Sequence, residues 1–239
     1  MEAEIMWRDN LHRFGLIALA TDMTIEADAA RLLPDDARLH VTRIAFDNPT
    51  TAENLRNTGP RLRAASALLV PGVALKGIGF GCTSASAVLG DGVQQAIGDR
   101  APIATPIAAA LRGFAAMGIG KIALMTPYLH ETTDLVGDHF EEHGLRVVAR
   151  HSMNYADDRD MALLPADEIV NFALEANHPD AEALFISCTA LPAVSVIERI
   201  EESLGKPVVS SNLALFWSML DVAQVPATGP GHLFGVRTW

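Results

Sequence analysis

The stretch Gly81-Cys82-Thr83-Ser84 marks the point where a buried strand gives way to a helix. The apolar residues Ile78 and Phe80 precede it, and a helical pattern from Ala85 to Ile97 comes after it. Exposed backbone N–H groups and the positive end of a helix dipole favour an anion at such a position. We therefore expect the Cys82 thiol to be a stronger acid than a free cysteine, and the thiolate is the reactive form.

A second cysteine stands in the same kind of place. Ser187-Cys188-Thr189 follows the strand-like segment Ala183-Leu-Phe-Ile186, and the chain contains only these 2 cysteines, each followed by threonine. One interpretation is that both are small buried structural thiols, because free cysteine is among the most buried residue types. The repeated setting favours the other interpretation, in which Cys82 and Cys188 are a catalytic pair.

The two halves of the chain resemble each other beyond the cysteines. Ile17-Ala-Leu-Ala-Thr21 matches Ile122-Ala-Leu-Met-Thr126, and the same offset, within one residue, relates Cys82 to Cys188. Strand and helix patterns alternate throughout, which predicts an α/β fold with parallel sheets. We expect two similar lobes, each a parallel sheet flanked by helices. A pseudo-two-fold axis would relate the lobes, with the active site between them.

The repeat also predicts how the chain divides. We expect residues 1–113 to form the N-terminal lobe, joined by a C-terminal helix at about 212–239, and residues 114–211 to form the C-terminal lobe. Ligands of parallel α/β sheets bind beyond the carboxyl ends of the strands. Four candidate side chains follow such ends: Asp22, Cys82, Tyr128 and Cys188. The two thiols would then face one cleft from opposite sides.

Local signals predict several further elements. Thr50 with Glu53 reads as a capping box for a helix over residues 52–69. One uninterrupted helix is expected over residues 85–97, and residues 154–159 are expected to form a polar loop.

Composition and charge argue against several classes of protein. The chain has 239 residues, of which 49% are hydrophobic and 20% charged, as in ordinary globular proteins. Its net charge of −11 leaves no basic footprint for nucleic acid or an anionic membrane. The most apolar stretch, residues 101–120, is too broken by Arg112, prolines and glycines for a membrane span. Residues 1–13 do not resemble a signal peptide, so we expect a reducing cytoplasm, although a Cys82–Cys188 disulfide stays open.

The paired Cys-Thr motifs resemble those of the aspartate/glutamate racemase superfamily, over nearly the whole chain. Gly81–Ser84 and Ser187–Thr189 look most like the maleate isomerase and arylmalonate decarboxylase branch. Within that branch, three segments resemble the ectoine-utilisation protein A group: residues 15–22, 43–51 and 184–191.

This resemblance implies a cofactor-independent, metal-free enzyme that acts on a small carboxylate. In maleate isomerases, the cysteine matching Cys82 adds to the double bond, and elimination follows rotation. The cysteine matching Cys188 donates the proton. The decarboxylases lack the first cysteine, so decarboxylation ranks lower for a chain that has both. A homodimer is an expectation from the family alone.

Hydroxyl groups beside the cysteines are candidates for binding substrate. We expect Thr83, Ser84 and Thr189 to bind carboxylate groups, although hydroxyls at a helix start are also ordinary caps. Tyr128 matches a family tyrosine that hydrogen-bonds substrate, and packing at a strand end is its alternative role.

Asp22 and Asp158 depart from the family pattern, because maleate isomerases place Asn at the aligned positions. An ionised Asp only accepts hydrogen bonds. Two such groups would repel a substrate carboxylate unless protonated, and would suit an ammonium or amide N–H instead. Their ordinary alternatives are a helix cap for Asp22 and a solvated loop for Asp158.

Two other motifs carry no function in our interpretation. His139-Phe-Glu-Glu-His143 fits the H-x-x-E-H metalloprotease pattern, but it lies at a polar helix end without an apparent third ligand. Gly77, Gly79 and Gly81 lack the spacing of a dinucleotide-binding loop.

The sequence as a whole therefore favours a cofactor-independent isomerase of a small carboxylic acid, working as a racemase or a cis–trans isomerase. A role in ectoine catabolism is the finer expectation. The alternatives are maleate isomerase proper, an arylmalonate-type decarboxylase, and a non-catalytic carboxylate-binding protein. The two retained thiols favour catalysis, because a binding protein needs hydroxyls and amides but not thiols.

Overall fold

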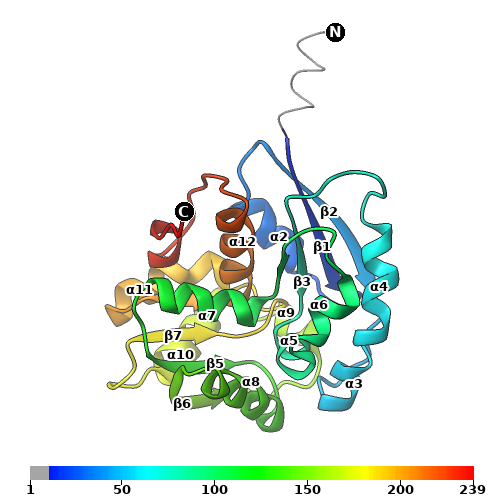
Figure 1. Cartoon of the computed structure of the whole chain (residues 1–239). Helices are drawn as coiled ribbons and strands as arrows, with labels where there is room; N and C mark the ends of the chain where they lie inside the picture. The colour runs from blue at the N-terminus through cyan, green and yellow to red at the C-terminus, as the bar shows by residue number, and fades with distance from the viewer. Residues whose placement is uncertain (1–10) are drawn as a thin grey trace.

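Two four-stranded parallel sheets form the framework of the computed structural model, which describes residues 11–239 (Figure 1). The first sheet has the order β2-β1-β3-β4, from β1 (His12–Leu19), β2 (Ala37–Ile44), β3 (Gly77–Gly81) and β4 (Ile103–Ala104). The second has the order β6-β5-β7-β8, from β5 (Lys121–Thr126), β6 (Arg146–Ser152), β7 (Ala183–Ile186) and β8 (Val208–Ser210). Corresponding strands occupy corresponding positions, which confirms the predicted two-lobed α/β fold.

The central strands are apolar on both faces because helices cover both sides of each sheet. Phe14, Leu16 and Ile17 of β1 are completely buried, and so are Ile122 and Leu124 of β5. The helices of the first half are α2 (Ile25–Leu32), α3 (Ala52–Arg56), α4 (Gly59–Leu68), α5 (Thr83–Leu89), α6 (Gly92–Ile97) and α7 (Pro106–Ala116). Those of the second half are α8 (His130–Glu142), α9 (Asp158–Ala162), α10 (Ala166–Ala176), α11 (Ile197–Leu204) and α12 (Ser211–Val222), with short 3₁₀ turns at η1 (Ala193–Val196) and η2 (His232–Gly235).

Three local predictions were wrong in detail. The helix expected over residues 52–69 is two helices, α3 and α4. Its cap is Thr51, whose side chain accepts from the backbone N–H of Asn54, so Thr50 is not part of a capping box. The helix expected over residues 85–97 ends at Gly90, which has a left-handed φ of 51°. The loop expected over residues 154–159 runs into α9, which begins at Asp158.

Helices α7 and α12 pack against each other between the sheets (Figure 1). Phe114 of α7 makes an edge-to-face contact with Phe185 of β7, with ring centroids 6.2 Å apart. Met219 of α12 lies so close to β3 that a Cβ built on Gly79 would be 2.9 Å from its Sδ. Each of these helices therefore contacts the sheet of the opposite half. The lobe boundary expected at residue 113 falls inside α7, and the division by residue range stays a prediction.

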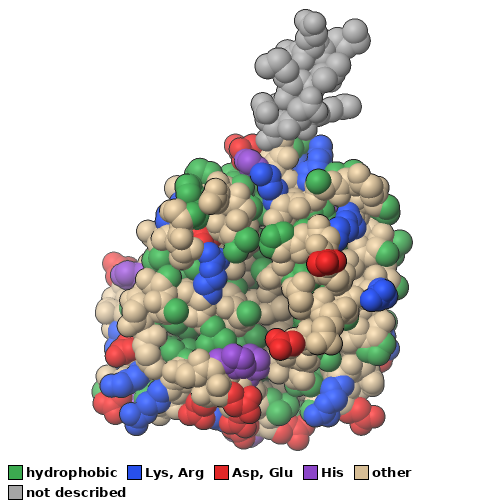
Figure 2. All heavy atoms as spheres, in the orientation of Figure 1, with side chains coloured by type: hydrophobic (Ala, Val, Ile, Leu, Met, Phe, Trp, Pro, Cys, Tyr) green, Lys and Arg blue, Asp and Glu red, His purple; other side chains and the backbone are tan. Residues whose placement is uncertain are grey.

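Among residues 11–239, no helix is both long enough and apolar enough to cross a membrane. Residues 1–10, on which the signal-peptide argument mainly rests, lie outside the described residues. The face drawn in Figure 2 is hollowed near its middle, with histidine side chains at the lower border of the hollow and acidic side chains along the lower edge.

Candidate active site

One pocket, lined throughout by buried residues, brings together all eight side chains chosen from the sequence. It lies beyond the carboxyl ends of β1, β3, β5 and β7, the two inner strands of each sheet. Those eight side chains are Asp22, Cys82, Thr83, Ser84, Tyr128, Asp158, Cys188 and Thr189, and the lining also includes Leu19, Thr50 and Ala190. The arrangement is the one that parallel α/β sheets use for ligands.

Cys82 follows strand β3 in an extended conformation and is the N-cap residue of α5. The preceding Gly81 allows α2 to approach, because a Cβ there would lie 2.4 Å from Cδ1 of Ile25. The thiol is a free one, is buried with 5% of the residue exposed, and its Sγ lies 3.8 Å from Oγ of Ser84. A hydroxyl at this distance can orient the thiol but makes only a weak hydrogen bond.

Cys188 occupies the corresponding place after β7 with a different backbone. Its φ of 91° is unusual for a residue with a side chain, and such strained conformations cost on the order of 1–3 kcal/mol and concentrate at functional sites. The thiol is free and 6% exposed, and its Sγ lies 3.8 Å from Sδ of Met161 in α9. The surrounding fold therefore holds Cys188 in a backbone conformation that is unfavourable for a residue with a side chain.

The expectation of an acidic Cys82 thiol was wrong. Burial raises the pKa of Cys82 to about 12, and the nearby carboxyl groups of Asp158 and Asp22 add to the rise. Hydrogen bonds from the backbone of Ala85 and the side chain of Ser84 oppose it without cancelling it. Burial also raises the pKa of Cys188, with Asp22 as the next cause. Loss of water disfavours a thiolate by more than one short helix end favours it.

The hydroxyl groups beside the cysteines connect the two halves of the protein. Thr83 Oγ1 donates to Oγ of Ser211 in α12 at 2.7 Å, and Thr189 Oγ1 donates to the carbonyl of Gly81 at 3.2 Å. Ser84 has the contact with Cys82 described above. All three hydroxyls line the cavity, and those of Thr83 and Thr189 also form hydrogen bonds between the two halves of the chain.

Tyr128 places its phenol beside the second cysteine. Its hydroxyl accepts from Oγ of Ser187 at 3.3 Å, and the residue is 2% exposed. Burial raises the pKa of Tyr128 well above its usual value, and Cys188 and Cys82 contribute to the rise. The phenol is therefore neutral and can donate a hydrogen bond inside the cavity.

Asp22 has two unlike carboxyl oxygens. Oδ1 accepts from the backbone N–H groups of Thr24 (2.8 Å) and Ile25 (2.9 Å), so the expected helix-capping role is present. Oδ2 is buried in the cavity wall and has no hydrogen-bond partner among residues 11–239. Burial raises the pKa of Asp22, while the two backbone hydrogen bonds and the nearby Thr189 hydroxyl work in the opposite direction.

Asp158 is not in a solvated loop, because it is 4% exposed in the first turn of α9. Both of its oxygens have donors: Thr21 Oγ1 donates to Oδ2 at 2.5 Å, and Asn48 Nδ2 donates to Oδ1 at 2.7 Å. These bonds join the two halves of the chain at the rim of the cavity. The carboxyl group of Asp158, which the sequence suggested as a second acceptor for the substrate, thus already accepts hydrogen bonds from the protein.

Sequence reasoning missed Thr50 as a cavity residue. Its Oγ1 is buried without a hydrogen-bond partner in the described part of the chain, and its carbonyl accepts from Oγ1 of Thr132 in α8 at 2.5 Å. The signal was its place in a turn that follows the carboxyl end of β2, where its hydroxyl was assigned to a helix cap instead.

A layer behind the cavity supports the Cys188 loop. Asn212 Nδ2 donates to Oδ2 of Asp28 in α2 and to the carbonyl of Thr189, both at 2.8 Å. Thr24 Oγ1 donates to the carbonyl of Ala190 at 2.5 Å. The loop that carries the second thiol is therefore held by Asn212 of α12 and by Thr24 of the first half, and Asp28 in turn holds Asn212.

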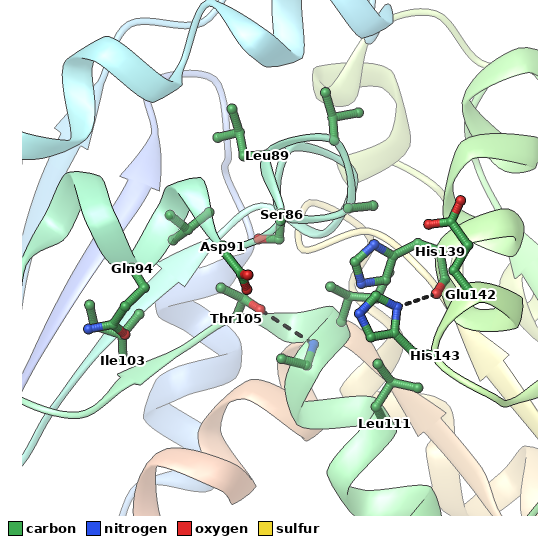
Figure 3. A pocket seen from close by; sticks show the side chains of 16 residues that line it. Ser86, Leu89, Asp91, Gln94, Ile103, Thr105, Leu111, His139, Glu142 and His143 are labelled. Carbon is green, nitrogen blue, oxygen red and sulfur yellow. Dashed lines mark hydrogen bonds between the residues drawn. The ribbon is translucent and has the colours of Figure 1, made fainter.

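The H-x-x-E-H motif lies in a different pocket, between α5, α6, α7 and α8. Figure 3 shows the imidazole rings of His139 and His143 stacked against each other, with centroids 4.2 Å apart. His143 Nδ1 lies 2.7 Å from the carbonyl of His139. Within residues 11–239, no group of three His, Cys, Asp or Glu side chains is placed to hold a metal ion.

Comparison with known proteins gives the family. A sequence model of the arylmalonate decarboxylase family matches residues 60–234. The chain is 24% identical to a maleate isomerase of Nocardia farcinica, with coverage of 92% of this chain and 94% of the relative. It is 27% identical to the arylmalonate decarboxylase of Bordetella bronchiseptica, with coverage of 92% and 95%.

The fold has close counterparts among solved structures. A Nocardia farcinica maleate cis–trans isomerase mutant with a covalently bound succinylcysteine intermediate superposes with a TM-score of 0.86 at 21% identity, over 94% of this chain and 98% of that one. The family match spans most of the chain and includes both Cys-Thr motifs, as the sequence motifs predicted. This chain therefore belongs to the arylmalonate decarboxylase family, and maleate isomerases are also among its relatives.

Proposed function

We propose that this protein is a cofactor-independent isomerase of a small carboxylic acid and that Cys82 and Cys188 are its two reacting groups. The observation that supports the proposal most is the placement of the two thiols. They follow equivalent strands, β3 and β7, and line one pocket. Two acid–base groups facing the same substrate from opposite lobes are what inversion or cis–trans isomerisation requires.

For an unsaturated acid, the reaction is an addition followed by an elimination. The Cys82 thiolate forms a C–S bond with one alkene carbon, and the π electrons move to the neighbouring carbon, stabilised by its carboxylate. The Cys188 thiol gives its proton to that carbon. Rotation about the resulting single bond, return of the proton to Cys188 and cleavage of the C–S bond give the isomer. The covalent succinylcysteine seen in the Nocardia farcinica enzyme is the intermediate of such a sequence.

For a saturated acid, the same pair would act as a racemase. One thiolate removes the proton from the carbon next to the carboxylate, and the opposite thiol supplies a proton to the other face. Tyr128 would donate a hydrogen bond to the substrate, while Thr83, Ser84 and Thr189 would contact its carboxylate. Neither route uses a cofactor or a metal.

The finer assignment is a step in ectoine catabolism, in the cytoplasm. It rests on the resemblance of residues 15–22, 43–51 and 184–191 to the ectoine-utilisation protein A group. A substrate of that kind would be a diaminobutyrate or one of its acetylated forms. Maleate isomerase proper is the second candidate, because the relatives that match over the full chain include a maleate isomerase.

Proton NMR in D₂O tests the function directly. Maleate, aspartate, diaminobutyrate, acetylated diaminobutyrates, hydantoins and arylmalonates would each be incubated with the protein. The variants are Cys82→Ala, Cys188→Ala and the double variant, which contains no thiol. We expect deuterium uptake or cis–trans conversion of one candidate by the unaltered protein alone. A ligand that stabilises the fold without any exchange would favour a carboxylate-binding protein instead.

A further inference from the structure

The charges that line the cavity do not favour binding of an anionic substrate. Among residues 11–239, no Lys, Arg or His side chain lines it, whereas two carboxyl groups, those of Asp22 and Asp158, do. The nearby guanidinium of Arg43 donates to the backbone carbonyls of Leu19 and Asp22 and pairs with Glu26. If both Asp side chains were ionised, a carboxylate would enter a low-dielectric site that already held two negative charges.

The two carboxyl groups differ in their hydrogen bonds. Asp158 has a donor on each oxygen, from Thr21 and from Asn48. Asp22 takes both of its donors on Oδ1 and leaves Oδ2 buried and unpaired. The hydroxyl of Thr189 lies within reach of this carboxyl group and acts to lower its pKa. That hydroxyl donates to the carbonyl of Gly81, and Oδ2 has no hydrogen-bond partner among residues 11–239.

An unpaired, buried carboxylate oxygen is costly, but a carboxylic acid needs only an acceptor for its O–H. Oδ1 then plays the part of the carbonyl oxygen, and Oδ2–H points into the cavity as a donor. We propose that Asp22 binds a carboxylate oxygen of the substrate as a neutral carboxylic acid that donates a hydrogen bond from Oδ2. Thr50, whose buried hydroxyl is also unpaired, is a second donor in the same cavity.

The electrostatic surroundings agree with a neutral Asp22. Burial raises the pKa of Asp22, and the carboxylate of Asp158 adds to the rise. The pocket lining around Asp22 contains the thiols of Cys82 and Cys188, the phenol of Tyr128 and the carboxyl group of Asp158, and it has no Lys, Arg or His among residues 11–239. Outside the lining, Arg43 pairs with Glu26, and Asp28 lies in α2. A carboxylic acid kept neutral in an apolar site so that it can donate is a known device of enzymes.

The protonation state of Asp22 decides which substrate group this side chain binds. An ionised Asp22 would select an ammonium or amide N–H, as the sequence suggested. A protonated Asp22 selects a carboxylate, but only below the pH at which it loses its proton. The inference rests on the proposed function for the class of ligand, a small carboxylate, but not on catalysis by either thiol.

Infrared difference spectroscopy tests the protonation state without turnover. We expect the unaltered protein at pH 7 to show the C=O stretch of a protonated carboxyl group that disappears in Asp22→Asn and shifts when maleate or succinate is added. Asn can retain the helix cap through its own Oδ1, so this variant should fold. The matched control is Asp28→Asn, another buried carboxyl of the same region, which is mostly ionised at pH 7 because its pKa is about 6.

Calorimetric binding of maleate and succinate from pH 5 to pH 9 provides the second measurement. We expect the affinity of the unaltered protein to fall up to tenfold per pH unit above the pH at which the band is lost. Asp22→Asn should bind with an affinity that does not depend on pH. Absence of the band, a more than tenfold loss of affinity in Asp22→Asn, or binding of diaminobutyrate but neither acid would each overturn the proposal. Deuterium exchange that needs both cysteines would still stand in those cases, so the two failures are distinguishable.

Discussion

Chemical modification of Cys82 gives the most direct test of the cavity's electrostatics. Because burial raises the pKa of Cys82 to about 12, against an ordinary value near 9.0, the thiolate population at neutral pH falls by about a thousandfold. The thiolate is the species that reacts with alkylating agents. In Cys188→Ser, where Cys82 is the only thiol, we therefore expect iodoacetamide to react about a thousand times more slowly than with an exposed cysteine.

The pH dependence separates a raised pKa from simple lack of access. A thiol that is only shielded reacts slowly but reaches its maximum rate near the ordinary pKa. A thiol with a raised pKa shows a rate that climbs tenfold per pH unit without levelling off up to pH 10. The ultraviolet absorbance of the thiolate, compared between Cys188→Ser and the thiol-free double variant, reports the same titration without any reagent. The protein unfolded in urea provides the control, with an ordinary thiol titration. A rate plateau or an absorbance midpoint below pH 9 in the folded protein would refute the argument from burial.

Three further predictions concern stability, each measured by urea unfolding. Gly81→Ala should lower the free energy of unfolding by about 1–3 kcal/mol, because its Cβ would lie 2.4 Å from a buried side-chain carbon of α2. Gly92→Ala is the control, because a Cβ there has no atom within 4 Å and crowding should cost it nothing. Equal losses in the two variants would contradict the packing argument. Burial raises the pKa of Asp28 from 3.8 to about 6. Its contribution to the free energy of unfolding is therefore complete below pH 3.8 and is lost as the pH rises through 6. The free energy of unfolding should fall by about 3 kcal/mol over this interval. Asp28→Asn should flatten stability over that interval, and an unchanged slope would rule this out. Asp221→Ala should cost about 3–5 kcal/mol, because it breaks a pair with Arg112 in which the Asp221 side chain is 1% exposed; a loss under about 1 kcal/mol would contradict it.

The sequence predicted the fold well because its strongest signals are local and repeated. The apolar runs at β1 and β5 each specify a strand, and the Cys-Thr motifs after β3 and β7 each specify the end of one. Parallel α/β topology then brings the carboxyl ends of the inner strands together, which is why the eight chosen side chains share one cavity. Their individual roles stay predictions.

The features that the sequence could not reveal depend on contacts between distant segments. The donors to Asp158 come from Thr21 and Asn48, more than a hundred residues away, and nothing local to Asp158 indicates them. The acidity of the Cys82 thiol was misjudged because a helix end is visible in sequence but the exclusion of water is not. Thr50 was overlooked because the same hydroxyl can serve as a cap or line a cavity, and only the three-dimensional structure distinguishes these roles.

The pKa values of the two thiols depend on the protonation state of Asp22. Burial affects Cys82 and Cys188 alike, which keeps their pKa values close together, and proton exchange between two faces of a substrate needs such similarity. The carboxyl group of Asp22 is itself a cause of the raised pKa of both thiols, and the second largest cause for Cys188. A proton on Asp22 removes that negative charge, so it makes both thiols easier to ionise while it supplies a donor for the substrate carboxylate. A protonated Asp22 would therefore reduce the negative charge that a substrate anion and a thiolate meet in a pocket without a cation in its described lining.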